Sequence, residues 1–180
     1  MKLTKFKWFW GWDFDKEEQW LNQMSAKGLQ LTGVGPATYI FDEATPGEYL
    51  YRIELLENVP SDPESFAYIR FLESTGVEYV GSFLRWVYFR KKAAEGSFDL
   101  YSDLDSRINL LRRIRTLMYW LLPMLLTSLF LNLGNFLDHR ASSSLAIVGV
   151  MMAVLLLYVI GLTNLYRKIE KLKKEKLIHE

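Results

Sequence analysis

Two long uncharged segments constrain this chain more than any other feature. Residues 117–137 form a run of 21 residues without a charge, and residues 145–166 form a second run of 22. As α-helices these runs would be roughly 31 to 33 Å long, which matches the roughly 30 Å hydrocarbon core of a bilayer. The seven residues between them, 138–144, are mostly polar. The sequence therefore predicts an antiparallel hairpin of two transmembrane helices.

The basic residues beside these segments predict how the hairpin is oriented. Ten lysine and arginine residues flank the two spans, whereas the loop between them contains only Arg140. Because basic flanks stay on the cytoplasmic side of a membrane, we expect both termini in the cytoplasm. Six of these residues are expected at the membrane surface, where they attract anionic lipid headgroups: Arg112, Arg113, Arg115, Arg167, Lys168 and Lys171.

The segments around and within the hairpin add further expectations. Residues 99–116 repeat leucine and isoleucine at spacings of three and four, which predicts an amphipathic juxtamembrane helix, and residues 167–180 form a basic cytosolic tail. Small residues at Gly149 and Ala153 permit close helix packing, either within the hairpin or in a homo-oligomer. Neither span contains an ionisable residue, which favours an anchor over an ion pathway.

The first 98 residues contain an internal repeat. The pattern of residues 20–28, with apolar residues at three positions and a final glycine, returns 48 residues later in residues 68–76. The segments that follow, 29–33 and 77–81, also correspond. A fixed offset of this kind indicates a duplicated unit, and the alternative is a chance match of apolar positions.

Each repeated unit, residues 5–43 and 49–92, has the pattern strand, helix, strand, strand. Alternating aromatic and polar residues predict the strands, and Gly28 and Gly76 predict the ends of the helices. The expected fold of residues 1–98 is a cytosolic α+β domain of tandem β-α-β-β units, with a mainly antiparallel sheet and helices on one face. This layout resembles GyrI-like effector-binding domains, which hold small apolar or cationic ligands between their halves.

A second resemblance rests on five short motifs spread over about residues 5–92. The motifs are Trp8-x-Trp10-x-Trp12-Asp13, Glu18-x-Trp20-Leu21-x-x-Met24-x-x-Lys27-Gly28, Tyr49-x-Tyr51-Arg52-Ile53, Gly76-Val77-Glu78-x-Val80 and Trp86-Val87-Tyr88-Phe89-Arg90. With the paired spans, this pattern resembles the DUF2812 family of bacterial membrane proteins, whose function is unassigned. The resemblance implies a bacterial cytoplasmic membrane. It also implies genes beside PadR-type transcription regulators, and so a role in envelope-stress or drug responses.

The soluble domain lacks the side chains that most catalytic sites need. The chain has no cysteine, and both of its histidines, His139 and His179, lie outside residues 1–98. No general base, thiol nucleophile or metal-ligand set is therefore apparent, and we expect a protein without enzymatic activity, cofactor or metal. These 98 residues hold 11 basic against 14 acidic side chains, so nucleic acid is not an expected partner.

The aromatic residues are the strongest candidates for a binding surface. Four tryptophans fall between Trp8 and Trp20, more than the core of so small a domain usually contains. They either belong wholly to the core or also line a pocket or interface. The candidate ligand- or partner-binding residues are Trp8, Trp10, Trp12, Trp20, Tyr49, Tyr51 and Trp86.

These observations favour a membrane-anchored cytosolic module that recognises a partner protein or a small apolar or cationic ligand and has a regulatory role. The alternative is an accessory or structural subunit of a membrane complex that acts through its transmembrane hairpin. Both hypotheses place the chain in contact with the lipid bilayer.

Overall fold

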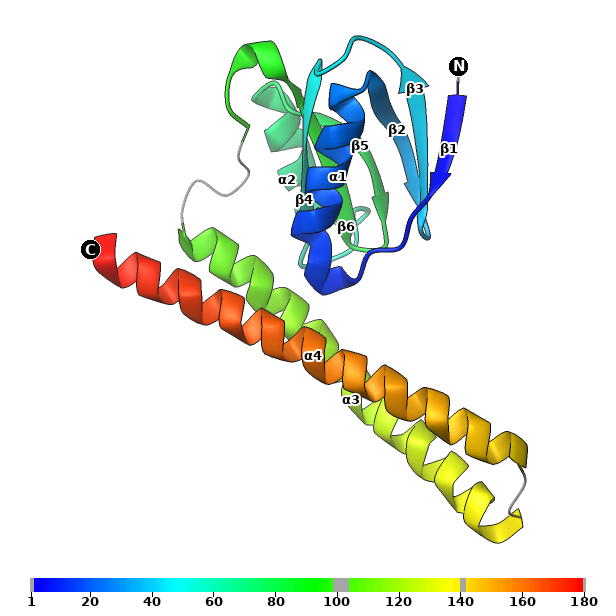
Figure 1. The fold of residues 1–180 in the computed structure, drawn as a ribbon. Coiled ribbons are helices and arrows are strands. Elements are labelled where there is room, and N and C mark those ends of the chain that lie inside the picture. The colour runs from blue at the N-terminus through cyan, green and yellow to red at the C-terminus, as the bar shows by residue number, and fades with distance from the viewer. Residues whose placement is uncertain (1, 99–103, 140–141, 180) are drawn as a thin grey trace. The chain divides into compact units, whose positions relative to one another are not determined.

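A computed structural model of the chain describes residues 2–98, 104–139 and 142–179 (Figure 1). The chain forms two compact units, Met1–Asp103 and Leu104–Glu180. The first is an α+β domain and the second is a pair of long helices. The expected fold class is therefore confirmed for both parts of the chain. The beginning of the predicted juxtamembrane helix, residues 99–103, lies outside the described residues.

The first unit contains two successive β-α-β-β segments. The first segment consists of β1 (Lys2–Phe6), α1 (Phe14–Ala26), β2 (Leu29–Gly35) and β3 (Thr38–Glu43). The second consists of β4 (Tyr49–Leu55), α2 (Pro63–Ser74), β5 (Glu78–Phe83) and β6 (Trp86–Lys92). Two short 3-10 turns, η1 (Gly11–Asp13) and η2 (Ala93–Glu95), precede α1 and follow β6.

The two segments have the same sheet topology. Each forms an antiparallel three-stranded sheet in which the third strand lies in the middle, in the orders β1-β3-β2 and β4-β6-β5. The register shifts between Leu31 and Gly33 in β2, and between Tyr79 and Gly81 in β5, again 48 residues apart. A bulge that recurs at the same place shows that the two units correspond in backbone detail.

Local sequence explains where the helices begin and end. The carboxylate of Asp62 accepts a hydrogen bond from the Glu64 amide at 3.0 Å, and Pro63 occupies the first helical position of α2. After α1, Gly28 adopts a φ of +80°, and a Cβ there would come within 2.8 Å of the Ala44 carbonyl oxygen. Only glycine fits this helix end, as the repeat predicted.

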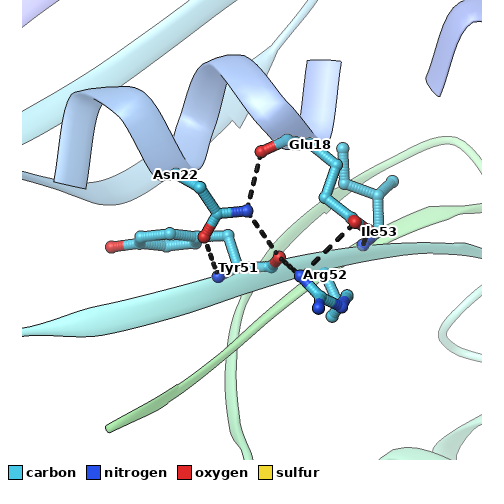
Figure 2. Close-up of polar contacts among 5 residues, drawn as sticks. All are labelled: Glu18, Asn22, Tyr51, Arg52 and Ile53. Atoms are coloured by element: carbon cyan, nitrogen blue, oxygen red, sulfur yellow. Dashed lines mark hydrogen bonds and ion pairs between the residues drawn. The ribbon is translucent and has the colours of Figure 1, made fainter. Parts of the chain in front are cut away.

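Polar side chains on α1 hydrogen-bond the edge strand of the second sheet (Figure 2). The Asn22 side chain accepts from the Tyr51 amide at 2.8 Å and donates to the Tyr51 carbonyl at 3.1 Å. Glu18 accepts from the Ile53 amide at 3.2 Å, and Ser25 donates to the Tyr49 carbonyl at 2.6 Å. The helix of the first segment thus satisfies the free edge of β4 in the second and fixes the position of α1.

The second unit is an antiparallel helix pair, α3 (Leu104–His139) and α4 (Ser142–His179) (Figure 1). The Tyr158 hydroxyl donates to the Met118 carbonyl, and Lys176 pairs with Asp105 at 2.7 Å. In the most apolar stretches of α3 and α4, only 6 % and 11 % of the residues are buried. Both helices are long and apolar enough to span a membrane, and their exposed apolar surface distinguishes them from core helices of a soluble protein.

Candidate functional site

A buried carboxylate lies at the centre of the first unit. Glu17, on α1, is only 8 % exposed. Its Oε1 atom accepts a hydrogen bond from the Tyr39 hydroxyl at 2.7 Å and another from the Tyr88 hydroxyl at 2.6 Å. Tyr39 belongs to β3 and Tyr88 to β6, so each β-α-β-β segment supplies one phenol. The carboxylate is therefore held at a position that exists only when both segments fold together.

The helical position of Glu17 explains why it is buried. Phe14, Leu21 and Met24 are buried apolar residues of α1 at helical spacing, and Glu17 occupies the remaining position of this stripe. Glu17 is not among the binding residues that the sequence predicted. The signal that could have identified it is an acid in the apolar stripe of a helix, where a leucine or valine is expected.

The environment of Glu17 raises the pKa of its carboxyl above the ordinary value. Burial raises the pKa of the Glu17 carboxyl, and the hydrogen bonds from Tyr88 and Tyr39 lower it in part. The pKa values of both phenols are raised, first by burial and then by the nearby carboxylate. Within the described part of the chain, Glu17 has no ion pair with lysine or arginine, and Oε2 accepts no hydrogen bond. A cation in contact with Oε2 would supply the missing counter-charge.

A cavity of about 290 Å³ lies against this carboxylate. The tips of the β2–β3 and β5–β6 hairpins border it, together with the segment that joins β1 to α1. Its aromatic lining residues are Trp8, Phe9, Phe14, Tyr39, Phe83, Trp86 and Tyr88. Phe14 and Trp86 pack with their ring centroids 6.0 Å apart. One carboxylate among aromatic faces is a suitable environment for an organic cation, because ring faces and carboxylate both attract positive charge.

The structure divides the seven predicted aromatic residues into several environments. Trp8 and Trp86 line the cavity. Trp10 and Trp12 stack with their centroids 5.0 Å apart, and Trp10 contacts Trp8 edge to face at 5.6 Å. Trp20 is 8 % exposed and packs in the core against Tyr39 and Phe41. The cavity therefore brings together only part of the predicted set.

The two predicted tyrosines lie where the sheets meet. Tyr51 is completely buried, and its hydroxyl accepts from the Leu31 amide at 2.8 Å and donates to Gln30 at 3.0 Å. The Arg90 guanidinium lies over the Tyr49 ring, 4.2 Å from the centroid of that ring. Both tyrosines support the junction of the two segments, and neither lines the cavity beside Glu17.

A second hollow of about 430 Å³ also borders the β1–α1 connection, and Trp8 and Phe9 line both hollows. Lys7, Trp10, Lys16 and Trp20 are among its lining residues. Lys7 places its ammonium group 4.9 Å from the Trp20 ring centroid, and Lys16 pairs with Asp13 at 2.8 Å. The acid of this hollow is therefore paired with Lys16, whereas Lys7, an exposed residue, contacts aromatic rings.

The predicted membrane-surface residues lie on α3 and α4. Arg112, Arg167 and Lys171 are exposed, whereas Arg113, Arg115 and Lys168 are half-buried. Several of these residues have contacts within the helix pair, and Arg112 donates to the Asn109 side chain at 3.3 Å. The Arg115 guanidinium lies 5.4 Å from the Tyr166 ring centroid, and Lys171 lies 3.8 Å from Glu175. The side chain of Arg140, in the predicted loop, lies outside the described residues.

The fold and the site define a duplicated β-α-β-β domain on a chain with two helices of membrane-spanning length. A family model described as a protein of unknown function, DUF2812, matches residues 13–123. The chain belongs to this family, as its motifs predicted. The match begins at Asp13, before α1, and ends at Pro123 within α3. No curated protein and no solved structure matches the chain.

Proposed function

We propose that the chain is a membrane-anchored binding module whose cavity takes a small apolar cation, such as a quaternary ammonium compound. The observation that carries the proposal is Glu17, a buried carboxylate without an ion pair among the described residues, at the wall of an aromatic cavity. A volume of about 290 Å³ suits a small ligand. Binding would be expected to shift Glu17 to its ionised form.

The proposed role is regulatory rather than enzymatic. The cavity lining contains no histidine, cysteine or lysine, and we assign its carboxylate and phenols to binding. Cation binding beside a PadR-type regulator would fit a drug-responsive function.

A pair of isosteric compounds tests the cation site directly. Phenyltrimethylammonium and tert-butylbenzene have nearly the same shape, but only the first is charged. We expect the full-length protein in lipid nanodiscs to bind the cation in a calorimetric titration. Glu17→Gln keeps an acceptor for both phenols but removes the negative charge. It should therefore weaken binding by about tenfold or more, which corresponds to a loss of roughly 1.4 kcal/mol or more.

The matched control for this experiment is Glu43→Gln. Glu43 is an exposed acid of the same domain outside the cavity, so its substitution removes the same net charge without changing the site. Equal binding of the two compounds, or a cation affinity that Glu17→Gln leaves unchanged, would refute the proposal.

The proposed topology places both termini in the cytoplasm of a bacterium. The ten flanking basic residues support it. A reporter enzyme that is active only outside the cytoplasm, inserted after Ser143, should be active. The same reporter at the C-terminus should be inactive, and the reverse pattern would reject this orientation.

The second candidate function is that of an accessory subunit acting through the hairpin. The large exposed apolar surface of α3 and α4 supports it, because such a surface can pack against other membrane helices as well as lipid. Exchanging residues 117–166 for an unrelated hairpin separates the two functions. Retained cation binding and cellular activity favour the cavity, whereas retained binding with lost activity favours the accessory function.

A further inference from the structure

The mouth of the cavity carries large apolar side chains that face solvent. Trp8 is 66 % exposed and Leu84 is 71 % exposed, and both line the cavity together with Ala37. Phe6, at the end of β1, is 80 % exposed and lies close by, because the Lys7 amide donates to the Ala37 carbonyl at 3.0 Å. We refer to Phe6, Trp8 and Leu84 as the apolar rim.

The backbone at Leu84 shows that the rim is not explained by turn formation. Leu84 lies between β5 and β6 and has a φ of +56°, a left-handed conformation that glycine or asparagine adopts with less strain. A polar residue there would also avoid exposing apolar surface. Leu84 therefore departs from two local preferences: glycine or asparagine at a positive φ, and a polar residue at an exposed turn. Such violations concentrate at functional positions, which indicates that the leucine side chain itself has a role.

The charge around the rim indicates which kind of surface it would contact. Residues 2–12 contain three lysines and no acid, whereas residues 13–98 contain 8 basic and 14 acidic side chains. The next acid along the chain, Asp13, is paired with Lys16. Exposed tryptophan and phenylalanine beside lysine is the composition of protein surfaces that insert into the headgroup region of a membrane.

We propose that the apolar rim docks on an anionic lipid bilayer. Trp8, Leu84 and Phe6 would enter the interfacial region, and Lys5 and Lys7 would attract the headgroups. The same chain carries two helices that can span a membrane, so the tether gives the domain a high effective concentration at a bilayer surface. The docking does not depend on whether Glu17 binds a cation. Its consequence is that the cavity opens towards the headgroup layer, where amphiphilic molecules accumulate.

The absence of cysteine from the chain makes the test direct, because one introduced cysteine is a unique attachment site. Leu84→Cys carries a spin label on the rim. Phe71→Cys carries it on α2, where the native side chain is 63 % exposed and lies outside the cavity lining. Both full-length proteins are placed in nanodiscs of equal parts phosphatidylglycerol and phosphatidylcholine. Relaxation by oxygen, which concentrates in lipid, is compared with relaxation by a water-soluble nickel chelate.

We expect the label at position 84 to gain oxygen accessibility and lose nickel accessibility relative to the label at position 71. Lys5→Gln with Lys7→Gln, or nanodiscs of phosphatidylcholine alone, should reverse this shift. Aqueous values at both positions would overturn the proposal. Loss of both oxygen and nickel accessibility at position 84 would indicate a protein contact and would also overturn it. Equal docking on neutral lipid would refute the requirement for anionic headgroups.

Discussion

The two β-α-β-β segments have the same strand order and the same bulge, but their helices have different roles. Glu17, Tyr39 and Tyr88 form the buried carboxylate site, and a shift of 48 residues relates these positions to Ser65, Val87 and Ile40. The corresponding set cannot reproduce the site, because it has neither a carboxylate nor a phenol. Although the β-α-β-β segment occurs twice, the positions that form the Glu17 site in one copy do not form a second such site in the other.

The two helices also differ in whether they contact the edge strand of the other sheet. Glu18, Asn22 and Ser25 of α1 hydrogen-bond β4, the edge strand of the other sheet. The corresponding residues of α2 are Phe66, Arg70 and Glu73, and the last two pair with each other at 3.0 Å on the surface. The chain uses α1 to join its two segments and α2 to cover its own sheet, which explains why side chains diverge where backbones agree.

The largest expected effect comes from breaking the contact between α1 and β4. Asn22→Ala leaves the amide of the fully buried Tyr51 without its side-chain partner and removes one of the two side-chain donors to the Tyr51 carbonyl, the other being Arg52. It should lower the free energy of unfolding of the first unit by about 3 kcal/mol. The matched substitution Arg70→Ala removes an exposed pair and should cost less than about 0.5 kcal/mol. Denaturant unfolding and amide hydrogen exchange at Tyr51 measure both. Equal effects would show that the two helices are equivalent.

A somewhat smaller effect is expected from removing one phenol of the site. Tyr88→Phe deletes one hydrogen bond to Glu17 and should destabilise the protein by about 2 kcal/mol, since a buried polar group that loses its partner costs about 1 to 3 kcal/mol. It should also raise the pKa of Glu17 further. The matched substitution Ile40→Val changes only packing and should cost about 1 kcal/mol without moving that pKa. A Glu17 pKa that is unchanged in Tyr88→Phe would contradict the description of the site.

The pH dependence of stability gives a third comparison, between the native protein and Glu17→Gln. Because the folded-state pKa of Glu17 is raised above its ordinary value of 4.5, the folded state binds a proton that the unfolded state has released. Its contribution is fully present below pH 4.5 and is lost as the pH rises through the raised pKa. The loss is about 1.4 kcal/mol for each tenfold difference in proton affinity between the folded and unfolded states. Glu17→Gln should remove this part of the pH dependence of the free energy of unfolding, as measured by denaturant unfolding at a series of pH values.

A bound cation should oppose this pH dependence of stability. A bound cation favours ionised Glu17, so affinity for phenyltrimethylammonium should increase with pH through the same range and then become constant. Identical pH profiles for the native protein and Glu17→Gln, with and without the cation, would show that Glu17 does not titrate in the folded state.

Much of the fold could be predicted because it depends on local patterns. Residues 117–137 and 145–166 are recognisable from length and lack of charge alone, and Gly28 and Gly76 marked the helix ends through their left-handed backbone. The tandem β-α-β-β order followed from a repeat visible in the sequence. Each of these features belongs to one continuous stretch of sequence or to a fixed offset between two stretches.

The site could be predicted only in part. Trp8 and Trp86 were identified as candidates and do line the cavity, but Trp20 and Tyr51, with similar aromatic character, are buried in the core. Their burial depends on which face of each element meets the other sheet. That arrangement is set by the order of strands and the contact between segments, which no single stretch of sequence encodes.

The sequence by itself determined the two long apolar helices, the duplicated domain and the family, because hydropathy, charge and glycine spacing act along the chain. Only the tertiary structure decided that Glu17 is buried and hydrogen-bonded to two phenols. Its two partners are 22 and 71 residues away, and its burial results from the packing of both segments around α1. An acid at the start of a helix is ordinarily stabilised by the helix dipole and water. In the folded protein, the hydroxyls of Tyr39 and Tyr88 and the aromatic lining of the cavity surround Glu17 in place of that water.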